Sequence, residues 1–172
     1  MKYGLGKYLH TFTVLGACSK SGMLGIGIAT YSLGVGGYCP VLEHNLGVVS
    51  SQAYANPRLG RLAMKLLNLG FSPGKILKEI EDQDSYFSYR QIGIVNRNGQ
   101  AACHTGPNTR QWAGHHVGDG YISMGNALAG QHVVDGIAKG FEDSEGQSLD
   151  ERLMRALEFG RDVGGQANAE GK

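Results

Sequence analysis

The sequence has almost no net charge, no long apolar run and no paired cysteine motif. Sixteen basic residues against 15 acidic residues leave a net charge of +1, which is too little to hold a phosphate backbone or an anionic membrane surface. Its apolar stretches fall far short of the roughly 20 residues that span a bilayer. We therefore expect neither a nucleic-acid partner nor a membrane.

The three cysteines, Cys18, Cys39 and Cys103, are odd in number and widely spaced. They form neither a disulfide framework nor a CxxC metal pair, which is typical of a reducing compartment. The first ten residues lack the apolar centre of a secretory signal, so the expected location is the cytoplasm. Cys103 lies in an apolar run and is predicted to be a buried, inert thiol. Cys39 lies in a glycine-rich segment and is predicted to be exposed.

The familiar motifs of hydrolases and nucleotide-binding proteins are also missing. The sequence contains no GxSxG, HExxH or GxxxxGK[ST] motif and no EF-hand loop. Residues 34–37 begin like a dinucleotide fingerprint, but the third glycine and the following helix are absent. No cofactor is therefore predicted.

Glycine and apolar residues are plentiful. The chain has 172 residues, 28 of them glycine, and 41% are hydrophobic, against a usual glycine share of about 7%. This length predicts a single domain, and the apolar fraction is sufficient for a packed core.

Strand patterns dominate the first part of the chain. Residues 11–18 and 23–31 are predicted to form a hairpin, and residues 46–53 a third strand after a glycine-rich loop over 32–45. Gly25 and Gly27 alternate with isoleucines and strip one face of the second strand of side chains. We expect another element to approach that face closely.

Helix signals come next, followed by more strands and two final helices. Asn56 and Pro57 predict one helix start, Ser72 and Pro73 a second, and Ser148 with its capping box a fourth; the third helix carries the apolar stripe of residues 133–141. Between them lie predicted hairpins over 90–105 and 111–125. Hairpins with segregated helices indicate an α+β fold with antiparallel sheets.

Polar residues at predicted strand ends are the candidates for chemistry. His104 lies at a predicted strand end, and its imidazole can act as an acid or a base near neutral pH. Asn126 offers an amide donor for an oxyanion. A hydrogen-bonded turn histidine and a turn asparagine are the plain alternatives. A metal site using His104, His115 or Cys103 is a further hypothesis, although the spacing matches no zinc signature.

A set of short segments in this order resembles a known family. They are residues 11–14, 48–57, 90–95, 104–106, 112–115, 125–126 and 164–165. This ordered set is similar to the bacterial and archaeal family called domain of unknown function 1028, which is grouped with the N-terminal-nucleophile (Ntn) hydrolases. The resemblance covers about residues 11–165.

The resemblance implies a four-layer αββα sandwich of two antiparallel sheets with helices outside. It also implies amide-bond hydrolysis, in which Thr11 at a mature N-terminus is the nucleophile. The α-amino group of that residue would be the base, because its pKa of about 7.7–8.0 leaves a neutral fraction at pH 7. Relatives usually continue into another strand, so the resemblance implies that this chain lacks a C-terminal strand.

The family's recurring polar positions fall on Gln52, Arg90, His104 and Asn126. The resemblance assigns Asn126 to the oxyanion and His104 to orientation or proton transfer. Gln52, Arg90 and also His115 are predicted to contact a small linear or cyclic amide substrate.

Residues 1–10 stand before Thr11 and are a leader, a tag or a misassigned start; residues 11–172 form the predicted domain. The leading hypothesis is a small amidohydrolase, with no cofactor and a homodimer as the expected assembly. The alternatives are a non-catalytic member that binds a small ligand or a protein partner, and a metal-dependent hydrolase.

Overall fold

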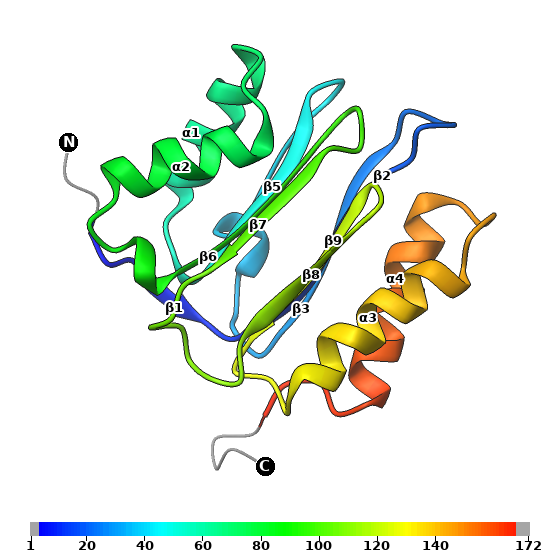
Figure 1. Ribbon diagram of the computed structural model, residues 1–172. Coiled ribbons are helices and arrows are strands. Elements are labelled where there is room, and N and C mark those ends of the chain that lie inside the picture. Colours follow the sequence, from blue (N-terminus) through cyan, green and yellow to red (C-terminus); the bar gives the residue numbers. More distant parts are fainter. Residues whose placement is uncertain (1–3, 168–172) are drawn as a thin grey trace.

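Two antiparallel sheets lie face to face, with a pair of helices outside each one (Figure 1). The computed structural model describes residues 4–167. Sheet A has the order β1-β5-β6-β7, with β4 also paired to β5, and sheet B has the order β3-β2-β9-β8. The predicted α+β class with two antiparallel sheets and outer helices is therefore confirmed.

The elements follow the chain in four groups. The first strands are β1 (Lys7–Leu9), β2 (Thr11–Ala17), β3 (Leu24–Thr30), β4 (Pro40–Glu43) and β5 (Gly47–Ala55). The helices α1 (Pro57–Asn68) and α2 (Pro73–Gln83) follow. The second set of strands is β6 (Arg90–Asn96), β7 (Ala101–Thr105), β8 (Gly114–Gly118) and β9 (Tyr121–Asn126). The helices α3 (Gln131–Asp143) and α4 (Leu149–Asp162) complete the fold.

Three layers of apolar side chains hold these elements together. One lies between sheet A and the helices α1 and α2, and another lies between sheet B and the helices α3 and α4. The third lies between the two sheets and contains Leu15, Val48, Val95, Ile122 and Met124. Because both faces of each sheet are covered, the strands read as nearly continuous apolar runs.

The predicted helix starts are present. The Asn56 side chain accepts a hydrogen bond from the backbone N–H of Arg58, with Pro57 at the first helical position. Ser148 and Glu151 form the capping box of α4. These caps satisfy backbone donors that have no partner within the helix.

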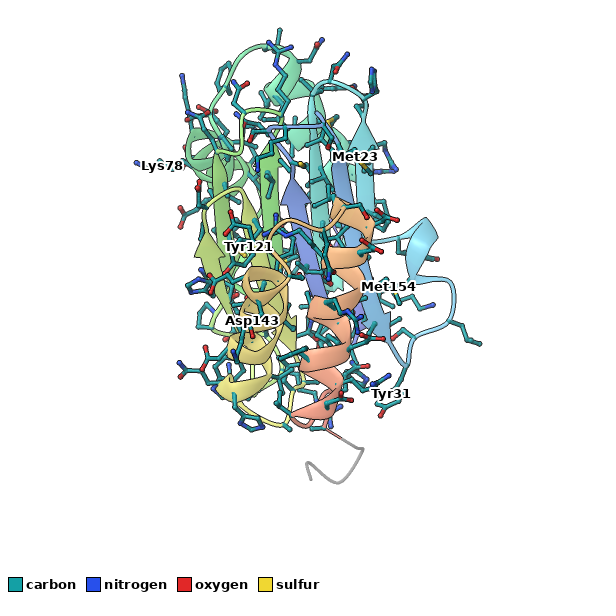
Figure 2. All side chains as sticks on the ribbon, turned by 90° about the vertical axis from the view of Figure 1, so that its right-hand side faces the viewer. Met23, Tyr31, Lys78, Tyr121, Asp143 and Met154 are labelled. Carbon is teal, nitrogen blue, oxygen red and sulfur yellow. The ribbon has the colours of Figure 1, made fainter. Side chains whose placement is uncertain are left out.

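The glycines of β3 allow α4 to approach sheet B closely. A Cβ at Gly25 would lie 2.6 Å from Leu153, and one at Gly27 would lie 3.0 Å from Leu157. Figure 2 shows α4 lying along this side of the molecule, with Met154 on its outer surface, where that residue is 59% exposed. The close approach predicted from the alternating glycines is confirmed.

Two local predictions are wrong. The predicted loop over 32–45 contains β4, which pairs with β5. Cys39, predicted to be exposed, is fully buried with Leu9 and Ala55, and burial raises the pKa of its thiol to about 12. A glycine-rich composition predicted a loop here, but the edge of β5 supplies hydrogen bonds that local sequence does not reveal.

Candidate functional site

Thr11 is the first residue of β2 and is completely buried. It lies opposite Thr30 of β3 on one side and opposite Asn126 of β9 on the other. Its hydroxyl donates a hydrogen bond to the carbonyl oxygen of Leu9, 3.1 Å away. The nucleophile implied by the resemblance is thus held between two strand ends, with its amino group still in the peptide bond to His10.

The carbonyl oxygen of His10 accepts a hydrogen bond from the Thr30 hydroxyl. The backbone N–H of Ser32 donates to the Thr30 Oγ1 at 3.0 Å, which leaves the hydroxyl proton to point at the carbonyl. The His10 ring beside it accepts a hydrogen bond from Arg110, and burial and this neighbouring cation lower the pKa of His10. The carbonyl of the His10–Thr11 bond is therefore polarised by a side-chain donor.

Side-chain amides form a buried network between the two sheets next to this bond. The Gln52 Nε2 donates to the Gln91 Oε1 at 2.9 Å, and the Asn126 Nδ2 donates to the same oxygen at 3.2 Å. Thr13 and Ser50 both donate to the Gln52 Oε1, at 2.7 and 3.1 Å. All five residues are fully buried, so every polar group here depends on a protein partner.

Gln91 is the centre of the network. Its Nε2 lies within hydrogen-bond distance of the carbonyl oxygens of Gly125 and Gly114 in sheet B, at 2.8 and 3.1 Å, and of the Thr105 hydroxyl at 3.0 Å. These contacts tie β6 to β8 and β9 across the interface between the sheets. The structure therefore connects two predicted site residues, Gln52 and Asn126, through a residue that sequence reasoning had not selected.

His115 joins the outer end of this network. Its Nδ1 lies 2.8 Å from the Thr105 hydroxyl. Because Thr105 accepts from Gln91, its own proton is available to the His115 nitrogen, which fits a neutral ring. Partial burial of the ring, together with His104 and His116 nearby, lowers the pKa of His115. The protein covers only part of the ring, and solvent reaches the rest of this residue, which stands at the rim of the network.

His104 points away from Thr11. Its ring stacks on Phe87 at a centroid distance of 3.7 Å, and its Nε2 lies 3.0 Å from the Phe87 carbonyl oxygen. Burial lowers the pKa of His104, although this hydrogen bond opposes the shift. Its neighbours on β7, Cys103 and Thr105, face sheet B instead, as strand alternation requires. His104 is therefore a hydrogen-bonded residue within β7, on the face opposite Thr105, and its predicted role at the Thr11 site stays a prediction.

Cys103 is half-buried, with its Sγ 3.5 Å from the Met124 sulfur. Burial raises the pKa of this thiol well above its usual value. Within residues 4–167 no group of three or more His, Cys, Asp and Glu side chains could hold a metal ion. The metal-dependent hypothesis thus finds no ligand set in this part of the chain.

Arg90 is completely buried and forms an ion pair with Asp84, at 2.7 Å between Nε and Oδ2. Its Nη2 also donates to the Asp84 Oδ1 at 3.3 Å, and Nη1 and Nη2 donate to backbone carbonyls. They reach Tyr54 at 2.6 Å, Gly4 at 2.8 Å and Leu5. Two of these three carbonyls belong to the segment before Thr11, and the predicted contact of Arg90 with a substrate stays a prediction.

Residues 4–10, which we call the leader segment, include β1 and connect sheet A to β2 of sheet B (Figure 1). β1 pairs with the edge of β5 near the site, Leu9 lying opposite Ala53. The Tyr8 hydroxyl lies 3.3 Å from the Asn126 Oδ1, and burial raises the pKa of Tyr8 to about 12. The leader segment therefore covers the amide predicted to bind an oxyanion.

Comparison with known proteins adds a family to this geometry. The model described as "Family of unknown function (DUF1028)" matches residues 11–171. The chain belongs to this family. The match begins at Thr11, so residues 1–10 lie outside the matched part. No curated protein matches the chain.

A crystal structure shares the fold of this DUF1028 chain. It is that of protein SPO2555 from Silicibacter pomeroyi, described with the same family model. The two are 29% identical, with a TM-score of 0.85 over 91% of this chain and 69% of the other.

Within residues 4–167, no helix combines the length and the apolar character needed to cross a bilayer.

Proposed function

We propose that this DUF1028 protein is an Ntn-type amide hydrolase in which Thr11 becomes the nucleophile once the His10–Thr11 bond is cut. The observation that carries the proposal is the hydrogen bond from Thr30 to the His10 carbonyl oxygen. A donor on this carbonyl oxygen would stabilise the negative charge that develops there when the threonine hydroxyl attacks the carbonyl carbon. The match of the family model from Thr11 onward also supports it.

The first reaction of the proposal frees Thr11. Its Oγ1 attacks the His10 carbonyl carbon, and the Thr30 hydroxyl stabilises the negative oxygen that develops. The C–N bond then breaks, the Thr11 nitrogen takes up the proton that the hydroxyl has lost, and an ester links His10 to Thr11. Water hydrolyses this ester, releasing the leader with the His10 carboxylate and regenerating the hydroxyl.

The second reaction repeats this chemistry on a substrate. The free α-amine of Thr11, with an ordinary pKa of about 7.7–8.0, takes the hydroxyl proton as the oxygen attacks an amide. The amine product leaves with that proton, and water clears the acyl-enzyme as a carboxylic acid. Asn126 lies opposite Thr11 in the strand register and is the proposed second oxyanion donor. Its Nδ2 donates to the Gln91 Oε1 in this structure, so this role requires the amide to exchange that partner for the oxyanion.

The experiment follows the intact mass of the full-length protein over time. We expect loss of residues 1–10 from the native chain and from Thr11→Ser, and none from Thr11→Ala. Thr30→Val is expected to slow the loss about a hundredfold, as when an oxyanion donor is removed, and Thr30→Ser to restore it. An unchanged rate in Thr30→Val would refute the role of Thr30.

A second candidate function is a non-catalytic domain that binds a small ligand or a protein partner. It is favoured by the complete burial of Thr11 and by the pairing of β1 with β5. The same mass measurement separates the two functions, because a non-catalytic domain keeps residues 1–10 in every variant.

A further inference from the structure

The leader segment lies along one edge of β5, and the surface that it covers there, formed by residues 53–55, Cys39 and Arg90, is called the groove below. Its main chain pairs with β5 over three residues, from Lys7 opposite Ala55 to Leu9 opposite Ala53. The remaining neighbour of that β5 edge, β4, pairs only with the first half of the strand. An extended chain is therefore the form in which this part of the edge is satisfied.

Two side chains of the leader fill pockets in the groove. Leu9 is fully buried against Cys39 and Ala55, with Ile28 and Val35 packed around them. The Tyr8 ring lies 4.7 Å from the ring of Tyr54 and directs its hydroxyl to Asn126. The residue second from the His10–Thr11 bond thus meets an apolar pocket, and the third meets an aromatic one.

The Arg90 side chain binds main-chain carbonyls at the far end of the leader segment. Its guanidinium donates to the carbonyls of Gly4 and Leu5 while Asp84 neutralises its charge. Departure of the leader would remove these two acceptors and open this end of the guanidinium to water. Another chain with carbonyls in the same places would accept the same two hydrogen bonds, which the charge on the donor strengthens.

Gly6 makes the groove selective between these two ends. Its φ is +91°, and a Cβ there would lie 2.2 Å from the Ala55 carbonyl oxygen and 3.3 Å from Arg90. Gly4 offers a contrast, because a Cβ at that position meets nothing within 4 Å. The groove therefore requires glycine at the fifth residue before the bond and accepts a side chain at the seventh.

We infer that this groove is the substrate's acyl-side binding site and that the substrate is an extended peptide. The inference rests on the proposed function, in which the leader is itself the acyl part of the first amide that Thr11 attacks. A later substrate must bring its carbonyl carbon to the Thr11 hydroxyl. The edge of β5 that pairs with β1 offers backbone hydrogen bonds to an extended chain lying between Arg90 and that hydroxyl. The preferred acyl part carries an apolar residue second from the bond and a glycine fifth from it.

The test uses the protein after it has cut its own His10–Thr11 bond. The probe is a synthetic, fluorescently labelled peptide with the sequence of residues 4–10 and a free C-terminal carboxylate, and its binding is measured by fluorescence anisotropy. We expect saturable binding that weakens at least tenfold when alanine replaces glycine at the position of Gly6. Alanine at the position of Gly4 is the matched control and should change binding less than twofold.

The released leader peptide should also stay bound to the cleaved protein during gel filtration. Its mass, detected in the protein peak after denaturation, would support the inference. Equal binding of the two alanine peptides, or no binding by any of them, would overturn the inference and leave the proposed function standing. A native chain that never loses residues 1–10 would overturn both, because β1 would then be a permanent edge strand.

Discussion

The Asp84→Ala substitution gives the clearest prediction for stability. The Asp84 carboxylate and the Arg90 guanidinium have no exposed side-chain surface, and two hydrogen bonds join them, at 2.7 and 3.3 Å. Removal of the carboxylate leaves a buried positive charge whose remaining partners are backbone carbonyls and the Tyr86 ring. The loss of one partner of a buried pair costs about 3–5 kcal/mol, a large share of the roughly 5–15 kcal/mol that stabilises a typical domain.

The expected result is a fall of about 6–20 °C in Tm, since 1 kcal/mol corresponds to about 2–4 °C at this chain length. Urea unfolding followed by circular dichroism measures the corresponding change in free energy. Asp143→Ala is the matched control, because the Lys139–Asp143 pair lies on the surface with side chains 63% and 51% exposed. That control should cost at most about 1 kcal/mol. Equal costs for the two substitutions would show that the buried Arg90 charge does not depend on Asp84.

Three further predictions concern close packing, thiols and pH. Gly25→Ala should lower the free energy of unfolding in urea by about 1–3 kcal/mol, because the added Cβ would lie 2.6 Å from Leu153. Gly36→Ala is the control, since its Cβ would have no atom within 4 Å. Equal costs for the two substitutions would contradict the close packing of α4 on β3. Iodoacetamide at pH 8 should modify Cys18 first, because hydrogen bonds with Ser21 lower its pKa while burial raises the pKa of Cys39 and Cys103; peptide mass mapping checks this order, and early labelling of Cys39 would contradict it. Burial lowers the pKa of His104 in the folded state, so the unfolded chain binds more protons, and the free energy of unfolding should fall as pH drops from about 6.5 through the lowered pKa. Urea midpoints at pH 7 and pH 5 should differ less in His104→Gln than in the native chain, with the exposed His44→Gln as control, and an unchanged difference in His104→Gln would contradict the assignment.

Local chemistry was enough to predict most helix starts and hairpins. Asn56 with Pro57 and Ser148 with Glu151 are caps that act within one turn, so their sequence is sufficient. The alternating glycines of β3 predicted a close neighbour, although not that the neighbour is α4. The α+β class followed from the order of these elements.

The missed features depend on contacts between distant segments. β4 forms because the edge of β5 is available for pairing, and Cys39 is buried beside that strand. A glycine-rich sequence indicates neither feature. Gln91 gave one signal, a polar side chain inside an apolar strand, but its partners lie on β5, β7, β8 and β9. Strand alternation placed His104 on the face opposite Thr105, and that orientation depends on a register that sequence alone leaves open.

The Thr11 site shows the same division. The resemblance selected Thr11, Gln52, Arg90 and Asn126, and the structure joins Asn126 to Gln52 by the amide network while Asn126 lies opposite Thr11. The resemblance did not select Thr30. The pairing of β2 with β3 brings the Thr30 hydroxyl to the His10 carbonyl oxygen. Arg90 was predicted to contact substrate, and it binds the carbonyls of the leader segment.

The intact mass of the full-length protein, followed with N-terminal sequencing during incubation at neutral pH, tests the role of Thr11 most directly. We expect the chain to lose residues 1–10 and begin at Thr11, and Thr11→Ala to keep its full mass under the same conditions. A native chain that retains residues 1–10 after long incubation would contradict the assignment of Thr11 as a nucleophile.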